Sequence, residues 1–132
     1  MFLDSNIVIY AYCNNSADKQ QKAKELFVNE NITISTQVLQ ETANTLYRKF
    51  KADFHTIRSL LEECVRNAYT FHVNTSETVF QACEIAERYQ YSFYDSLIIA
   101  SALEVECEIL YSEDMQHNQF IEGKLKIINP FL

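Results

Sequence analysis

The sequence contains a single glycine, Gly123, and a single proline, Pro130, among its 132 residues, and it has no tryptophan. The P-loop and the dinucleotide-binding turn each need several glycines, because only glycine lets the backbone approach a phosphate so closely. A G-x-S-x-G nucleophile elbow is excluded for the same reason. If this chain acts on phosphates, it must therefore bind them through side chains or metal ions.

Positive charge is also scarce, because 11 lysine and arginine residues stand against 18 acidic residues and give a net charge of −7. A protein that binds nucleic acid mainly by bulk electrostatics needs a basic surface, and this composition argues against one. It leaves open a local basic groove, or cations held by clustered acidic residues. The densest basic segment contains Arg48, Lys49 and Lys51.

The four cysteines are widely spaced, and none forms a C-x-x-C pair or stands at a zinc-ligand interval from a histidine. Each lies in or beside an apolar stretch, so we expect small buried thiols in a reducing compartment. The apolar runs fall far short of the roughly 20 residues that a membrane span needs, and the N-terminus lacks a basic leader. We therefore expect one cytoplasmic domain over residues 1–132, with no membrane association.

Patterns typical of strands and helices alternate along the chain. Apolar and β-branched runs predict strands at residues 1–3, 32–35, 71–73, 108–112 and 125–128, and the first apolar run resumes at residues 7–12. Helical spacing predicts helices at residues 17–29, 37–50, 54–67, 76–89 and 93–105. The last of these is apolar nearly all round, which is typical of a helix buried on most sides. The alternation predicts βαβ units and a mostly parallel sheet covered on both faces.

Acidic residues stand at the ends of several predicted strands. Asp4 follows the first strand, and Glu41 lies about one turn into the helix after the second. Asp114 lies two residues beyond the strand that ends at Ser112. Function collects outside the carboxyl ends of the strands in such sheets, so these three acids are expected at one edge. Asp95 stands in the first turn of the most apolar helix.

Converging carboxylates predict a metal site, although each acid also has an ordinary structural explanation. Buried carboxylates need partners, and a hard divalent cation such as Mg²⁺ or Mn²⁺ is the usual partner of several oxygen ligands. Such an ion would also let an acidic protein hold an RNA backbone. Equally, Asp4 can serve as a turn residue, Glu41 as a solvated helix acid and Asp114 as a loop acid. Asp95 can stabilise the start of its helix together with Ser92.

Four segments carry a resemblance to a known family. They are Leu-Asp-Ser-Asn at residues 3–6, the helix with Glu41, the stretch Tyr-Asp-Ser-Leu-Ile-Ile-Ala-Ser-Ala at residues 94–102, and Leu-Tyr-Ser-Glu-Asp at residues 110–114. In order, spacing and total length they resemble the PIN domain, and within it the VapC-type toxin ribonucleases of bacterial toxin–antitoxin pairs. The resemblance covers essentially the whole chain.

This resemblance implies a three-layer α/β/α sandwich with a mostly parallel sheet. It also implies a metal-dependent endoribonuclease that hydrolyses RNA phosphodiester bonds with water activated by Mg²⁺ or Mn²⁺. The acidic residues of the family match Asp4, Glu41, Asp95 and Asp114, which are therefore expected to hold the metal and to be catalytic. His117 stands where some members carry a further acid, which leaves the number of metal ions open.

Three further residues are candidates for supporting roles. Asn6 matches the asparagine of the opening motif and is expected to orient Asp4 or its loop. Ser112 is expected to support the site through a hydrogen bond. Arg48 stands two helical turns after Glu41 and is a candidate RNA contact, although basic residues also suit a helix C-terminus.

The partners that the resemblance implies are an RNA substrate, either a tRNA or a ribosomal RNA, a cognate antitoxin and a second copy in a homodimer. The alternative is a non-catalytic PIN-like module that binds a metal or a basic peptide partner and cuts nothing.

Overall fold

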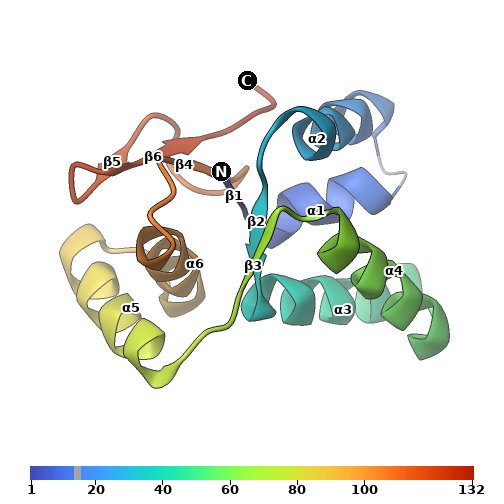
Figure 1. Ribbon diagram of the computed structural model, residues 1–132, viewed down its shortest axis with the longest axis horizontal. Coiled ribbons are helices and arrows are strands. Elements are labelled where there is room, and N and C mark those ends of the chain that lie inside the picture. Colours follow the sequence, from blue (N-terminus) through green and yellow to red (C-terminus); the bar gives the residue numbers. More distant parts are fainter. Residues whose placement is uncertain (14–15) are drawn as a thin grey trace.

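A six-stranded sheet forms the centre of the molecule (Figure 1). The computed structural model describes residues 1–13 and 16–132, and in this part of the chain the strand order is β3-β2-β1-β4-β6-β5. Neighbouring strands are parallel except β5 and β6, which are antiparallel. The strands are β1 (Phe2–Leu3), β2 (Thr33–Ser35), β3 (Thr70–His72), β4 (Ile109–Tyr111), β5 (Phe120–Ile121) and β6 (Leu125–Ile128).

Helices cover both faces of this sheet, with α5 and α6 on one side and α1 to α4 on the other (Figure 1). The helices are α1 (Ser5–Tyr12), α2 (Ala17–Asn29), α3 (Thr36–Phe50), α4 (Phe54–Asn67), α5 (Ser76–Tyr89) and α6 (Phe93–Glu104). The predicted three-layer α/β/α sandwich with a mostly parallel sheet is therefore confirmed.

The core lies between the sheet and its helices. Phe2, Leu3, Ile34, Leu110 and Ile127 are fully buried on the central strands. In α6 every residue from 96 to 102 is buried, as its apolar circumference predicts. Strands and a helix of this kind are stabilised chiefly by the apolar area that they remove from water.

The largest departure from the sequence prediction is α1. The apolar run that follows the Asp-Ser-Asn break is a helix and not a continuation of the first strand. The Asp4 carboxylate accepts a hydrogen bond of 2.7 Å from the first backbone N–H of α1, which ends the strand and caps the helix. Ile7, Val8 and Ala11 are buried, so packing overrides the preference of β-branched residues for strands.

Smaller features also differ from the prediction. The two-residue strand β5 was not predicted, because its pattern is too short to detect. Helix α3 begins at Thr36, one residue before the predicted start, and is capped by Ser35, whose hydroxyl accepts a hydrogen bond from the N–H of Val38. The prediction of buried thiols is wrong for Cys83, which is exposed on α5, and Cys107 is only partly buried. Among the described helices, none has the length and apolarity needed to cross a membrane.

The scarcity of glycine has a visible consequence for the backbone. Gly123 adopts a φ of 66° in the turn between β5 and β6, where glycine is favoured. In the described residues, five other left-handed positions carry ordinary side chains, namely Lys51, Gln90, Glu106, Asn118 and Glu122. Each such residue costs roughly 1–2 kcal/mol relative to the right-handed conformation.

Glycine at one of these positions should therefore stabilise the protein. We expect Glu106→Gly, at a φ of 57° and an exposed position after α6, to raise the free energy of unfolding by about 1 kcal/mol. Thermal unfolding would show this as a rise in Tm of about 3 °C. The matched control is Glu84→Gly, at an exposed position inside α5, which should lower stability by about 1 kcal/mol. Equal losses in both variants would contradict the prediction.

Candidate active site

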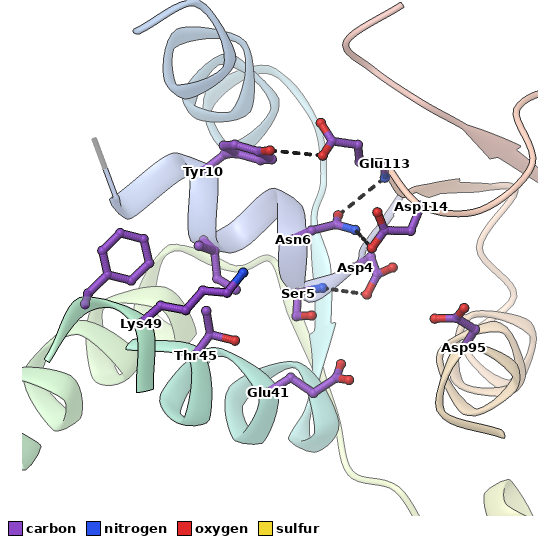
Figure 2. A pocket seen from close by; sticks show the side chains of 12 residues that line it. Asp4, Ser5, Asn6, Tyr10, Glu41, Thr45, Lys49, Asp95, Glu113 and Asp114 are labelled. Carbon is purple, nitrogen blue, oxygen red and sulfur yellow. Dashed lines mark hydrogen bonds between the residues drawn. The ribbon is translucent and has the colours of Figure 1, made fainter. Parts of the chain in front are cut away.

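A cavity of about 330 Å³ lies where β1 and β4 end, at the carboxyl edge of the sheet. Its wall carries five acidic side chains: Asp4, Glu41, Asp95, Glu113 and Asp114 (Figure 2). The described residues contribute one basic side chain to this wall, that of Lys49. The four acids singled out in the sequence therefore line the same cavity, which we call the acid pocket.

Asp4 is the most deeply buried of the four acids, with 5% of its surface exposed. The hydroxyl of Ser112 donates a hydrogen bond of 2.8 Å to one carboxylate oxygen, and the N–H of Ser5 donates to the other. Burial raises the pKa of Asp4 from 3.8 to about 7, against the lowering effect of these two bonds. The nearby charges of Glu41 and Asp95 raise it further.

Glu41 reaches the pocket from the second turn of α3 and is partly buried. Its Oε1 atom is buried and has no hydrogen-bond partner among the described residues. Burial raises the pKa of this carboxyl, and Asp95 adds to the shift, while the polar groups of Ser5 and Gln37 partly offset it. A buried acceptor without a donor is costly and favours a cation.

Asp95 combines the two roles that the sequence left open. Its backbone N–H donates a hydrogen bond of 3.3 Å to the hydroxyl of Ser92, which caps α6. This bond does not use the Asp95 side chain, which faces the pocket (Figure 2). Burial raises the pKa of Asp95, the side chain of Ser92 partly offsets this shift, and the charge of Asp114 adds to it.

Asp114 is exposed, and Asn6 holds it in place. The side-chain amide of Asn6 donates a hydrogen bond of 3.1 Å to Asp114 and accepts one of 3.4 Å from the backbone N–H of Glu113 (Figure 2). Asn6 therefore fixes the loop after β4, whereas the sequence analysis expected it to orient Asp4 or the loop of Asp4. Ser112 performs that task for Asp4.

Glu113 differs from the other acids of the pocket because its charge is paired. Lys19 lies 2.7 Å from one carboxylate oxygen, and the hydroxyl of Tyr10 donates a hydrogen bond of 3.0 Å to the other. Glu113 and its two partners were not among the site residues predicted from the sequence. Lys19 lies 94 positions and Tyr10 lies 103 positions away from Glu113 in the sequence, so no local pattern indicates these contacts.

The basic residue in the pocket is Lys49 and not its neighbour Arg48. Glu41, Thr45 and Lys49 line the wall at intervals of four residues along α3. Arg48 is exposed and does not line the pocket. Residues four apart and residues seven apart both lie on nearly the same side of a helix, so spacing from Glu41 permits either Lys49 or Arg48 in the wall. The orientation of α3 on the sheet places Lys49 there.

The chemistry of the pocket fits a hard divalent cation. Its donors are carboxylate oxygens, which Mg²⁺ and Mn²⁺ prefer, and the unpartnered oxygen of Glu41 offers a ligand. Within residues 1–13 and 16–132, however, no three Asp, Glu, His or Cys side chains are gathered closely enough to form a ready-made metal site. Glu41 and Asp95 point into the pocket from α3 and α6 (Figure 2).

Comparison with solved structures gives related folds. The chain is similar to VapC20 of Mycobacterium tuberculosis, described as a sarcin–ricin loop cleaving toxin, with 20% identity, a TM-score of 0.67 and coverage of 83% of this chain and 85% of that one. VapBC2 from Rickettsia felis, bound to a DNA fragment from its promoter, gives 20% identity and a TM-score of 0.66, with coverage of 96% and 95%. A toxin–antitoxin complex from Klebsiella pneumoniae gives 16% identity and a TM-score of 0.70, with coverage of 98% and 96%.

A search of curated proteins finds no significant match. At the identities above, the solved structures support the fold alone. The family comparison is more specific, because the PIN domain matches residues 1–121, which is most of the chain. The chain therefore belongs to the PIN domain family.

Proposed function

We propose that this protein is a metal-dependent endoribonuclease that hydrolyses RNA phosphodiester bonds and acts as the toxin of a toxin–antitoxin pair. The observation that carries the proposal is the acid pocket, into which the end of β1, α3 and α6 each bring one carboxylate and the loop after β4 brings two. Membership of the PIN domain family supports it. So does the similarity to VapC20, which is described as cleaving the sarcin–ricin loop.

In this proposal Asp4, Glu41, Asp95 and Asp114 hold Mg²⁺ or Mn²⁺ and are the catalytic residues. When bound, the cation supplies Lewis-acid chemistry, since it lowers the pKa of water and neutralises phosphate charge. Asp4 is the fixed member of the set because Ser112 and the backbone hold both of its oxygens. The carboxylates of Glu41 and Asp95 would rotate to approach Asp4, because the four acids are not gathered in advance.

Other residues of the pocket position the acids and the substrate. Asn6 restrains Asp114 through its amide, and Ser112 restrains Asp4. Lys49 supplies the positive charge of a wall whose other side chains are acidic or neutral. Arg48 remains a candidate RNA contact on the exposed side of the same helix.

Removing one metal-binding carboxylate should abolish turnover without loss of the fold. We expect Asp4→Asn and Asp95→Asn to reduce Mn²⁺-dependent RNA cleavage by at least about 100-fold, measured on a panel of tRNA and ribosomal RNA. In metal-free buffer Asp95→Asn should be no less stable than the wild type, because the cap at Ser92 uses the backbone and the substitution removes repulsion.

The matched control for cleavage is Glu87→Gln, at an exposed acid of α5. Retained cleavage by either pocket variant would remove that residue from the proposed mechanism. A wild-type protein that binds Mn²⁺ but cuts no RNA of the panel would favour the non-catalytic PIN-like module instead.

The raised pKa of Asp4 predicts a pH dependence of stability. In metal-free buffer the folded protein keeps a proton on Asp4 up to a pKa of about 7, whereas the unfolded chain loses it near 3.8. The stabilisation that comes from this bound proton is therefore complete at a pH below 3.8, and it is lost as the pH rises through about 7. We expect denaturant unfolding in EDTA to give lower stability at pH of about 8 than at pH of about 5.

The difference should be much smaller in Asp4→Asn, which has no proton to lose, and unchanged in Glu87→Gln. An identical pH dependence in the wild type and Asp4→Asn would show that the carboxyl of Asp4 ionises normally.

The proposed toxin function requires a partner that blocks it. We propose that the chain acts in the cytoplasm as a homodimer and binds a cognate antitoxin. The similarity in fold to a toxin–antitoxin complex from Klebsiella pneumoniae supports the antitoxin partner. Expression of the chain alone should arrest growth, and co-expression of the neighbouring small open reading frame should relieve the arrest. The Asp4→Asn chain should not arrest growth. Arrest by this variant would show that growth inhibition does not depend on the acid pocket.

A further inference from the structure

The corner between α3 and α4 exposes aromatic and basic side chains together. Arg48, Lys49 and Lys51 stand within four residues at the end of α3, and all three are exposed. Tyr47 and Phe54 are 51% and 64% exposed on either side of this corner. We call this surface the aromatic–basic corner, and its members are Tyr47, Arg48, Lys49, Phe50, Lys51 and Phe54. It places three of the 11 basic residues of an acidic chain at one point.

The two outer aromatic rings form an exposed stacked pair. The ring centroids of Tyr47 and Phe54 are 4.7 Å apart, and the ring planes differ by 15°. The core beneath the corner is supplied by other residues, namely Cys13, Leu46 and Ile57. The stacked pair is therefore not needed to fill the interior, and it presents a flat apolar surface to solvent.

The corner is held in a defined shape by local hydrogen bonds. Lys51 ends α3 in the left-handed conformation, at a φ of 57°. Asp53 then caps α4, because its carboxylate accepts a hydrogen bond of 2.8 Å from the N–H of Thr56 and a second from the hydroxyl of that residue. The backbone of the corner and the two stacked rings are therefore ordered in advance, which lowers the entropy cost of binding.

Part of this surface lines the acid pocket. Lys49 and Phe50 belong to the corner and also line the pocket wall. The acids of the pocket repel a polyanion, so a substrate strand needs positive charge and stacking surface close by. Charge complementarity favours a nucleic-acid strand at the corner, and the exposed stacked rings favour unpaired bases, because a duplex does not offer its base faces.

We propose that the aromatic–basic corner binds the unpaired RNA strand that leads into the acid pocket. A base stacks on the pair formed by Tyr47 and Phe54, and phosphates contact Arg48, Lys49 and Lys51. This inference rests on the proposed function only in taking RNA as the ligand, and binding can be measured separately from cleavage.

The test measures binding of a fluorescently labelled single-stranded oligouridine to the full chain in EDTA, by anisotropy. We expect the double variant Tyr47→Ala, Phe54→Ala to weaken binding by about tenfold, as loss of one base stack does. The triple variant Arg48→Gln, Lys49→Gln, Lys51→Gln should reduce the slope of log K against log salt by about 2, since each phosphate contact on a single strand contributes about 0.7. A duplex of the same length should bind more weakly than the single strand.

Matched controls lie elsewhere on the molecule. Tyr69→Ala removes a ring that is 74% exposed before the start of β3, at the opposite edge of the sheet from the pocket. Lys22→Gln removes an exposed charge on α2. Both variants should bind like the wild type. If the double alanine variant unfolds, the double variant Tyr47→Leu, Phe54→Leu replaces it, because leucine keeps apolar volume at the corner and still removes the stacking rings.

The outcomes separate this inference from the proposed function. Binding that depends on the corner in a protein that cuts no RNA would support the inference and remove the proposed activity. Cleavage by the wild type, together with unchanged binding by the corner variants, would overturn the inference alone. Failure of the wild type to bind the strand would overturn it too. So would corner variants that bind RNA normally but lose self-association or antitoxin binding, because the corner would then be a protein interface.

Discussion

The buried carboxylate of Asp4 is the point on which the site depends. It stands where β1 ends, and a carboxylate so deeply buried is costly unless donors surround it. One donor is the N–H that begins α1, and the other is the hydroxyl of Ser112, 108 positions away in the sequence. The same side chain therefore ends a strand, starts a helix and joins the first and fourth strands of the sheet. The parallel pairing of β1 with β4 makes this contact possible.

Charge is arranged around this point in three ways. Asp4, Glu41 and Asp95 have no cationic partner among the described residues, and their pKa values are raised, chiefly by burial. Glu113, by contrast, is paired with Lys19. Basic residues at the end of α3 form a local positive surface, although the net charge of the chain is −7. An acidic protein can in this way combine a pocket that favours a cation with a local basic surface that favours an RNA strand.

Much of the fold was predictable, because buried parallel strands and amphipathic helices leave strong periodic patterns. The bounds of α4 and α5 agree with the sequence prediction at both ends. Helix α1 was missed because its β-branched residues favour a strand locally, and only burial against the core favours the helix. The choice of Lys49 over Arg48 in the pocket wall depends on how α3 is rotated on the sheet, which residue spacing does not fix.

The sequence by itself determined the layered α/β architecture and the place of Asp4, Glu41 and Asp114 at one edge of the sheet, with Asp95 added by the family resemblance. It could do so because parallel strands place their carboxyl ends, and the residues that follow them, at the same edge of the sheet. Only the tertiary structure decided which acid each supporting group holds: Asn6 holds the loop of Asp114, Ser112 holds Asp4, and Lys19 holds Glu113. Such contacts join side chains about a hundred residues apart, and hydrogen bonds of that kind leave no periodic trace along the chain.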